Sequence, residues 1–177
     1  MKTPRLNLRR FNLNDFANMR ELEANPDVMC NSPHRFPLTD ERIQERLQAM
    51  INNEPSRAPL GIWAAELTEG SDFVGWFMLL QRDLPFVELG FMIVQRHWGQ
   101  GYTAEACQRL IHLALVELNY PGLSAVTDAE NNQSIRVLQK SGFGFVKQYS
   151  QFDKVLQKDV LLNLYELTRD SYQSRHQ

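Results

Sequence analysis

Arg96-His97-Trp98-Gly99-Gln100-Gly101-Tyr102-Thr103-Ala104 separates an apolar run typical of a strand from one typical of a helix. The first turn of a helix carries four main-chain N–H groups without intrahelical partners, together with the positive end of the helix dipole. Glycines at such a turn let an anion approach the backbone closely. The layout therefore predicts a phosphate-binding loop.

The glycine spacing alone leaves two cofactor folds open. Gly99-x-Gly101-x-x-Ala104 also matches the dinucleotide fingerprint G-x-G-x-x-G/A. A dinucleotide fold needs repeated strand–helix–strand units on a parallel sheet. Here four candidate strands, joined mostly by turns, precede the loop, and the chain ends at residue 177. That order of elements favours a different phosphate-bearing ligand.

Apolar periodicity predicts a mixture of strands and helices along the rest of the chain. Strands are expected over residues 5–11, 61–67, 73–81, 86–94, 123–127, 143–149 and 160–167. The short connections between residues 61 and 94 indicate an antiparallel meander. Helices are expected from an Asn14 or Asp15 cap through Leu22, from a Thr39 cap to about Asn52, from Ala106 to Leu118, and from about Gln133 to Lys140 with Gly142 at C′. The polar tail, residues 170–177, is expected to fray.

Composition limits the classes of protein to which the chain can belong. With 177 residues and 43% hydrophobic content, it fits one domain over residues 1–177. The net charge of −2 gives no argument for nucleic acid, and no apolar run approaches the ~18 residues of a membrane span or resembles a signal peptide. We therefore expect a cytoplasmic protein that binds neither nucleic acid nor membrane. Cys30 and Cys107 are too few for a metal cluster, and the histidines lack ligand spacing, so no metal is expected.

From Phe86 to Phe145 the chain resembles the GNAT N-acetyltransferase superfamily, whose signature R/Q-x-x-G-x-G/A is supplied by residues 96–101. Glu88-Leu89-Gly90-Phe91-Met92-Ile93 is similar to the fourth strand of that family, and Asn131-x-x-Ser134-x-x-Val137-Leu138-x-Lys140-x-Gly142-Phe143 to its late cofactor-side helix. At the N-terminus, Arg5-Leu6-Asn7-Leu8-Arg9, Asp15 and Asn25-Pro26-Asp27-Val28 resemble the ribosomal-protein N-alpha-acetyltransferase branch.

This resemblance implies an α+β fold: a mostly antiparallel sheet of six or seven strands flanked by about four helices. It also implies acetyl-CoA as co-substrate. Main-chain amides from Gly99 to Thr103 would hold the pyrophosphate, and main chain of Met92 to Val94 would pair with the pantetheine arm and offer an amide to the thioester carbonyl. The cofactor-binding residues expected are Met92, Ile93, Val94, Arg96, Trp98, Gly99, Gln100, Gly101, Tyr102, Thr103 and Asn131.

Glu88 is the candidate general base under this resemblance. It lies on the expected fourth strand and shares parity with Gly90 and Met92, so it can face an acceptor groove. The alternative for a strand glutamate is a solvated or ion-paired surface group. An α-amino group, with an unperturbed pKa of about 7.7 to 8, would demand little of such a base, and a water relay would also suffice.

Ser134 is the candidate acid that protonates the leaving CoA thiolate. Many members of the superfamily use a tyrosine four residues before the glycine of the late Gly-Phe pair, and this chain has Leu138 there. Ser134 is the hydroxyl one turn upstream, and Asn131 is expected to hold pantetheine or order a water. The alternative is that Asn131 or Ser134 caps the short helix, and both roles are compatible.

The implied reaction is direct acetyl transfer to a primary amine in a ternary complex, with the N-terminal α-amine of a protein, such as a ribosomal-protein serine, as acceptor. A small amine such as a polyamine or an aminoglycoside stays open, as does a non-catalytic acyl-CoA-binding module, because Leu138 replaces the tyrosine. Acceptor specificity is expected in residues 28–38 and 148–158. The last strands or an exposed sheet edge could join two copies into a homodimer.

Overall fold

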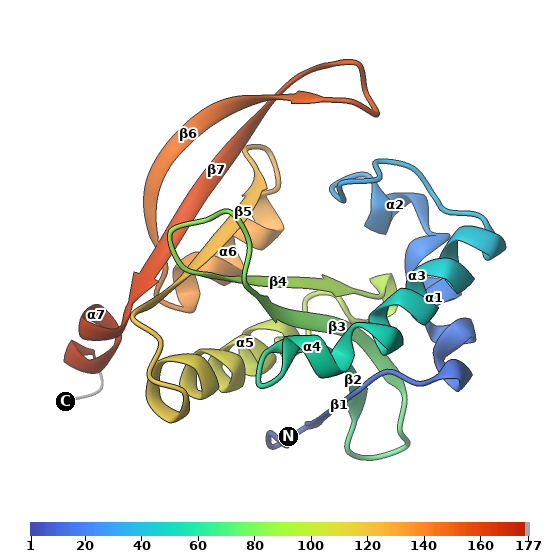
Figure 1. Cartoon of the computed structure of the whole chain (residues 1–177), viewed down its shortest axis with the longest axis horizontal. Coiled ribbons are helices and arrows are strands. Elements are labelled where there is room, and N and C mark those ends of the chain that lie inside the picture. The colour runs from blue at the N-terminus through green and yellow to red at the C-terminus, as the bar shows by residue number, and fades with distance from the viewer. Residues whose placement is uncertain (176–177) are drawn as a thin grey trace. The chain divides into compact units, whose positions relative to one another are not determined.

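The computed structural model describes residues 1–175, and its strands form a seven-stranded sheet in the order β1-β2-β3-β4-β5-β7-β6 (Figure 1). The strands are β1 Leu6–Arg9, β2 Gly61–Leu67, β3 Phe73–Leu80, β4 Val87–Ile93, β5 Gly122–Asp128, β6 Gly144–Asp153 and β7 Lys158–Thr168. Strands β2, β3 and β4 follow chain order, as the short turns between them predict, β1 lies beside β2, and β7 lies between β5 and β6. The expected α+β class and strand number are confirmed.

Four α-helices of eight or more residues accompany the sheet, which matches the expectation. They are α1 Phe16–Glu23, α3 Asp40–Asn52, α5 Tyr102–His112 and α6 Asn132–Lys140. The shorter helices are α2 Pro26–Met29, α4 Glu54–Arg57 and α7 Arg169–Ser174. Helix α5 continues as a π-helical segment over Leu113–Glu117. No helix of the described residues is long and apolar enough to cross a membrane.

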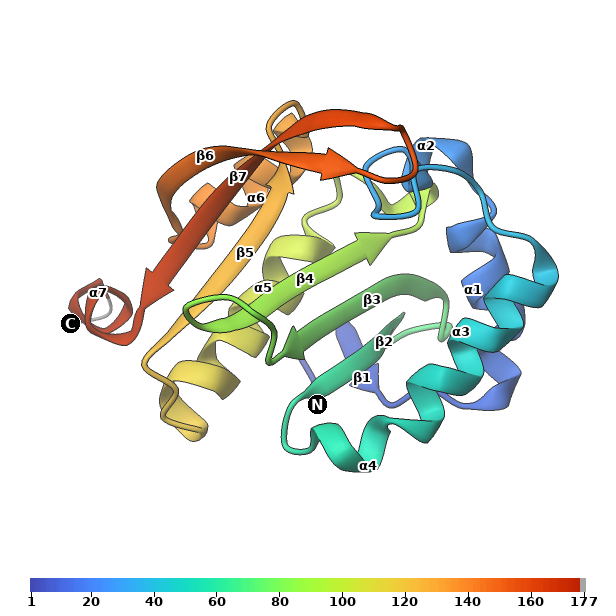
Figure 2. The same ribbon diagram turned by 45° about the horizontal axis from the view of Figure 1, so that its top comes forward.

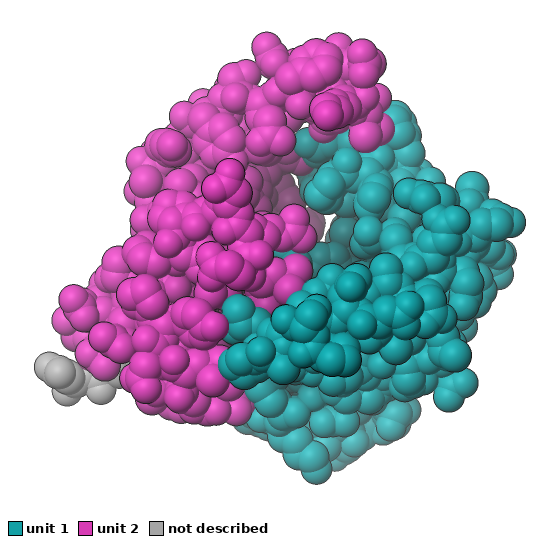
Figure 3. Space-filling view, viewed as in Figure 1, with its two compact units in different colours: residues 1–78, 91–102 teal, residues 79–90, 103–177 magenta. Residues whose placement is uncertain are grey.

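The chain folds into two compact units, each built from two separate stretches (Figure 3). Unit 1 comprises residues 1–78 and 91–102, and unit 2 comprises residues 79–90 and 103 to the end of the described chain. The chain leaves unit 1 after Met78 and returns at Phe91, so β4 contributes residues to both units.

In unit 1, β1 pairs antiparallel with β2, and Arg9 joins this pair to the following helical turn. Arg9 donates to both carboxylate oxygens of buried Asp15, at 2.8 and 2.6 Å, and to Glu66. Asn12 and Asp15 form a capping box at a 3-10 turn, Leu13–Asp15, that leads into α1. Asp15 is the N-cap residue of α1, one of the two positions expected, but its side chain makes no capping bond to that helix. The side-chain cap lies one turn earlier, where Asn12 has extended backbone and accepts from the Asn14 amide.

In unit 2, β5 and β6 both pair antiparallel with β7, and β6 and β7 form a long hairpin (Figure 2). Helix α6 ends as expected, since Gly142 has a φ of +99° and the amides of Gly142 and Phe143 donate to the carbonyls of Gln139 and Leu138. This is the Schellman pattern, in which a left-handed glycine closes the helix.

Three short helices depart from the sequence prediction. Asn25-Pro26 ends α1 as expected but also starts α2, because the Asn25 side chain accepts from the Asp27 amide and proline suits the first helical position. Glu54-Pro55 starts α4, where proline again lies in the first turn but the N-cap residue Asn53 makes no side-chain capping bond. In the tail, Thr168 caps α7, so residues 169–174 are helical where fraying was expected; residues 176 and 177 lie outside the described chain.

Candidate active site

The glycine loop joins the end of β4 to α5 and belongs to unit 1 up to Tyr102. Gly99 and Gly101 have φ values of +75° and +82°, a left-handed backbone that residues with a Cβ adopt at a penalty. Within residues 1–175, the main-chain amides of residues 99–103 donate to no acceptor, and a Cβ built at Gly99 would meet no atom within 4 Å. Unpaired amides beside open space at a helix start are the donor set that a phosphate requires.

Arg96 and His97 fix the start of this loop to the turn between β2 and β3. Arg96 donates to Asp72, at 2.7 Å for the shorter contact, and to the carbonyl of Phe73, and it forms an ion pair with Glu21. The Nε2 atom of His97 lies 2.9 Å from a carboxylate oxygen of Asp72. The guanidinium of Arg96, a predicted cofactor ligand, is thus engaged in holding the loop.

Trp98 and Tyr102 are also held within unit 1. The indole of Trp98 donates to the carbonyl of Ile93 at 2.9 Å. Arg5 lies over the ring of Tyr102, 4.6 Å from its centroid, and donates to the carbonyl of Gln100. Arg5 was missed as a site residue, because its position in an alternating strand pattern gives no sign that β1 runs beside the glycine loop.

At the end of β4, some main-chain amides point to the edge of the strand beside β3 and others point to the opposite edge. The amide of Val94 donates to the carbonyl of Val74 at 3.0 Å, so it is committed to β3. Because successive residues of an extended chain present their amides to opposite edges, the Ile93 amide points away from β3. A Cβ built at Gly75 would lie 2.1 Å from the carbonyl oxygen of Met92, so only glycine allows β3 to pass this closely. Of the predicted stretch Met92 to Val94, Ile93 is the residue that faces outward.

Glu88 lies in unit 2, on β4, where it is in register with Ser124 of β5. Its side chain is 14% exposed, and Arg82 Nε lies 2.8 Å from its Oε2 atom. Burial raises the pKa of the Glu88 carboxyl, and the positive charge of Arg82 opposes that rise. Oε2 is buried and accepts no correctly directed hydrogen bond, so this contact is a charge pair without hydrogen-bond geometry. Glu88 is therefore ion-paired, as the alternative reading expected, and its role as a general base stays a prediction.

Tyr149 of β6 lies within electrostatic range of Glu88 and was not among the predicted site residues. Burial raises the pKa of its phenol, and the negative charge of Glu88 raises it further. The phenol therefore keeps its proton and can act as a hydrogen-bond donor near the carboxylate. Its closeness depends on the strand order β4-β5-β7-β6, which no local pattern reveals.

Asn131 and Ser134 meet at the start of α6, also in unit 2. The side-chain oxygen of Asn131 accepts from the Ser134 amide at 3.1 Å, so the expected capping role is present. The Asn131 side-chain NH2 group and the Ser134 hydroxyl make no hydrogen bond within the described residues. Leu138 is buried at 2% exposure and contributes to the core of unit 2. A hydroxyl is therefore available at Ser134 and not at position 138.

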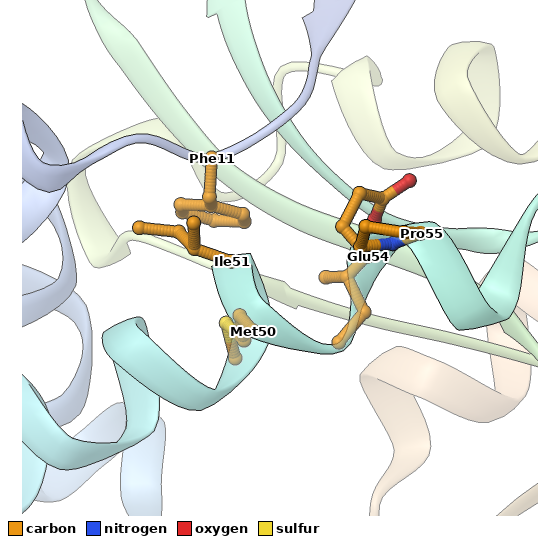
Figure 4. Close-up of a pocket in the computed structure, with 6 residues that line it drawn as sticks. Phe11, Met50, Ile51, Glu54 and Pro55 are labelled. Carbon is orange, nitrogen blue, oxygen red and sulfur yellow. The ribbon is translucent and has the colours of Figure 1, made fainter.

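Other conspicuous features lie apart from these residues. Cys107 is fully buried, and desolvation raises the pKa of its thiol, so it is unsuited to nucleophilic attack. In unit 1, a cavity of about 190 Å³ is lined by Phe11, Met50, Ile51, Glu54, Pro55 and Ile62, none of them a predicted site residue (Figure 4). Among residues 1–175, no three His, Cys, Asp or Glu side chains gather so as to hold a metal ion.

Comparisons with known proteins identify relatives of the whole chain. The family model "Acetyltransferase (GNAT) domain" matches residues 5–144. A Bacillus licheniformis protein described as uncharacterized N-acetyltransferase p20 is 24% identical over 172 residues, 96% of each chain. The structure of a GNAT-family acetyltransferase from Bacillus anthracis has a TM-score of 0.85 at 19% identity, covering 96% of this chain and 98% of that one.

Two further structures share the fold but differ in acceptor. An acetyltransferase from Salmonella typhimurium that modifies the N-terminal serine of a 50S ribosomal subunit protein has a TM-score of 0.80 at 14% identity, with 94% and 96% of the chains covered. Spermidine N-acetyltransferase from Vibrio cholerae, in complex with CoA and spermine, has a TM-score of 0.78 at 15% identity, with 95% and 98% covered. At these identities the likeness concerns the fold alone.

Proposed function

Because the chain belongs to the GNAT acetyltransferase family and so transfers acetyl from acetyl-CoA to an amine, we propose that its acceptor is the α-amine of a protein N-terminus. The observation that supports this choice of acceptor is the ion pair between the carboxylate of Glu88, whose side chain is 14% exposed, and the cation of Arg82. This pair suits an acceptor that brings one amine and little further positive charge.

In this proposal the glycine loop binds the donor. The unpaired amides of residues 99–103 hold the pyrophosphate of acetyl-CoA, and Arg5, beside Gln100 and Tyr102, adds positive charge. Arg96 and Trp98 keep the loop in place through Asp72 and Ile93. The Ile93 amide faces the pantetheine arm or the thioester carbonyl, where it stabilises the oxyanion.

The reaction proceeds by direct attack. The neutral amine nitrogen bonds to the thioester carbonyl carbon, Glu88 accepts a proton from that nitrogen, and the C–S bond breaks as the carbonyl re-forms. Ser134 donates a proton or hydrogen bond to the departing thiolate, while the Asn131 NH2 group holds pantetheine. The products are the acetylated amine and CoA.

The charges near Glu88 support a protein N-terminus over a polyamine. A polyamine carries several positive charges, which a single carboxylate cannot neutralise and which Arg82 repels. An α-amino group has an unperturbed pKa of about 8, close to neutrality, so a carboxylate with a raised pKa suffices to take its proton. A serine-starting ribosomal-protein terminus is the first substrate to try.

The test is acetyl-CoA with a panel of acceptors: peptides starting with Ser, Ala or Asp, and spermidine and aminoglycosides beside them. Release of CoA thiol and peptide mass gain are measured. We expect the Ser-starting peptide to be acetylated with the highest kcat/KM. Preference for spermidine or an aminoglycoside would make this a small-amine acetyltransferase, and CoA binding without turnover of any amine would make it a non-catalytic module.

The C-terminal hairpin supports a homodimer as a further part of the proposal. Strand β6 is at the edge of the sheet, and large apolar side chains on the hairpin are about half exposed: Phe145, Val146, Phe152, Val155 and Leu161. An exposed apolar edge strand is a ready surface for pairing with a second copy. Light scattering of the purified protein should give twice the chain mass of 20.6 kDa, and a monomer at micromolar concentration would contradict it.

A further inference from the structure

Arg82 and Glu88 form an ion pair whose two side chains differ strongly in their exposure to solvent. Arg82 lies in the loop between β3 and β4 and its side chain is 55% exposed, whereas that of Glu88 is 14% exposed. An exposed arginine on a loop exchanges readily with water, because a solvated ion pair is worth little. A buried carboxylate, in contrast, needs a partner at all times.

The contact leaves the carboxylate incompletely satisfied. Arg82 Nε lies 2.8 Å from Oε2, yet Oε2 accepts no correctly directed hydrogen bond and is buried from solvent. Buried charged oxygens normally accept at least one hydrogen bond, so an unsatisfied oxygen at this position points to a donor that arrives with a ligand. The ammonium form of a primary amine has three N–H donors and one positive charge, and fits this demand.

We propose that Arg82 occupies in the free enzyme the place that the acceptor's ammonium group takes beside Glu88, and that acceptor binding displaces it. The inference rests on the proposed amine acetylation. Arg82 is then a positioning residue that acts through Glu88. It neutralises the carboxylate until an amine binds, and it excludes other cations that bind Glu88 too weakly to displace it.

Displacement also links acceptor binding to the strength of the base. In the free enzyme Arg82 lowers the pKa of Glu88 from the value that burial alone would give. Ser124, opposite Glu88 on β5, is neutral, and the phenol of Tyr149 on β6 is protonated. Lys147 of β6 has its ammonium 5.8 Å from the Tyr149 ring, and its charge is not among the causes that shift the pKa of Glu88. Arg82 is thus the one close cation beside Glu88 in the described chain.

The experiment compares the wild type with Arg82→Met and Arg82→Lys, using the peptide acetylated best. Arg42→Met is the matched control, since Arg42 pairs with a glutamate that is 62% exposed. KM for peptide and for acetyl-CoA are measured, together with the pH dependence of kcat/KM, which reports the free enzyme, and of kcat, which reports the ternary complex.

We expect Arg82→Met to lower the peptide KM about two- to fivefold and to leave the acetyl-CoA KM unchanged. A change of that size corresponds to the free energy of an ion pair with one exposed partner, which the peptide no longer has to break. The acid limb of kcat/KM should move to higher pH, while the acid limb of kcat stays in place. Arg82→Lys should restore the wild-type pattern, and Arg42→Met should change nothing.

The other outcomes are distinct. If both acid limbs move together, Arg82 stays paired throughout the reaction and displacement is wrong. If neither limb moves, or the peptide KM rises, Arg82 does not compete with the acceptor and the inference fails while the proposed function stands. If the wild type acetylates no amine of the panel, the proposed function is wrong, and this inference, which rests on it, is wrong as well.

Discussion

Oδ1 of Asp72 lies 2.7 Å from Nη2 of Arg96, and this ion pair ties the start of the glycine loop to the turn between β2 and β3. The same carboxylate contacts His97. We expect Asp72→Ala to raise the KM for acetyl-CoA about fivefold, or ~1 kcal/mol, because the pair is partly exposed and Arg96 keeps its bonds to Phe73 and Glu21. At saturating acetyl-CoA, kcat should be unchanged.

Glu69→Ala is the control for this prediction, because Glu69 is an exposed acid in the same turn. Steady-state kinetics with varied acetyl-CoA provide the measurement. A fall in kcat with KM unaltered would show that Asp72 acts on the chemical step and not on donor binding.

Gly99 offers a sharper test of the phosphate site. Alanine there must adopt a φ near +75°, which destabilises the folded state by about 1–2 kcal/mol, and its methyl group would project into the open space beside the unpaired amides. We expect Gly99→Ala to lower thermal stability modestly and to weaken CoA binding at least tenfold in calorimetry.

Gly70 supplies a matched control, since it also has a positive φ, +81°, and a Cβ built there meets nothing within 4 Å. Gly70→Ala should show the same loss of stability with normal CoA binding. Equal effects of the two substitutions on binding would argue against a phosphate at the glycine loop.

Local sequence patterns located the strands either from alternating burial, as along β1, or from continuous apolar runs, as along β2 and β3. Leu6 and Leu8 are buried on β1, and Ile43, Leu47 and Met50 recur on one face of α3, so periodicity alone located these elements. The short helices were missed where an Asn-Pro or Glu-Pro pair ends one helix and starts the next. The 3-10 turn before α1 and its Asn12 cap were missed because several polar residues compete there, as Asn12 does with Asn14 and Asp15.

The candidate site was only partly predictable for a different reason. The glycine loop and the α6 cap are local and could be read from spacing. The closeness of Tyr149 to Glu88 and the contact of Arg5 with Tyr102 depend on which strands become neighbours. The pairing of Arg82 with Glu88 depends on the conformation of the loop between β3 and β4. Strand order is a property of the whole chain, so these relationships required the structure.

Asn131 has two separable roles that substitutions can divide. Asn131→Ala removes the side-chain acceptor that caps α6 and should destabilise the protein by about 1 kcal/mol, with weaker acetyl-CoA binding. Asn131→Asp keeps a capping oxygen but lacks the NH2 donor, so it should retain stability and still raise the acetyl-CoA KM. Thermal melts and steady-state kinetics measure the two effects. A normal acetyl-CoA KM in the aspartate variant would mean that Asn131 only caps α6 and does not bind the cofactor.

Ser134→Ala tests the proposed acid without disturbing that cap, because the cap uses the Ser134 amide and not its hydroxyl. We expect kcat to fall about tenfold or more with the melting temperature unchanged, since proton transfer by a positioned group contributes about 10²–10⁴-fold and water can replace part of it. Unaltered kcat at all pH values would assign thiolate protonation to water or to another hydroxyl.

Glu88→Gln should reduce activity and increase stability at the same time. Removal of the base is expected to lower kcat/KM by about 10²-fold and to abolish the acid limb of its pH profile.

The pKa of Glu88 is raised in the folded protein above its ordinary value of 4.5, so the stability that this group contributes is full below pH 4.5 and is lost as pH rises through the folded pKa. The variant should therefore melt at a higher temperature than the wild type at pH 7 and at the same temperature at pH 4. Glu69→Gln, which changes an exposed glutamate, should melt like the wild type at both pH values. Full turnover in Glu88→Gln would assign the proton transfer to a water relay, and equal melting temperatures at pH 7 would mean that Arg82 fully offsets the burial of the carboxylate.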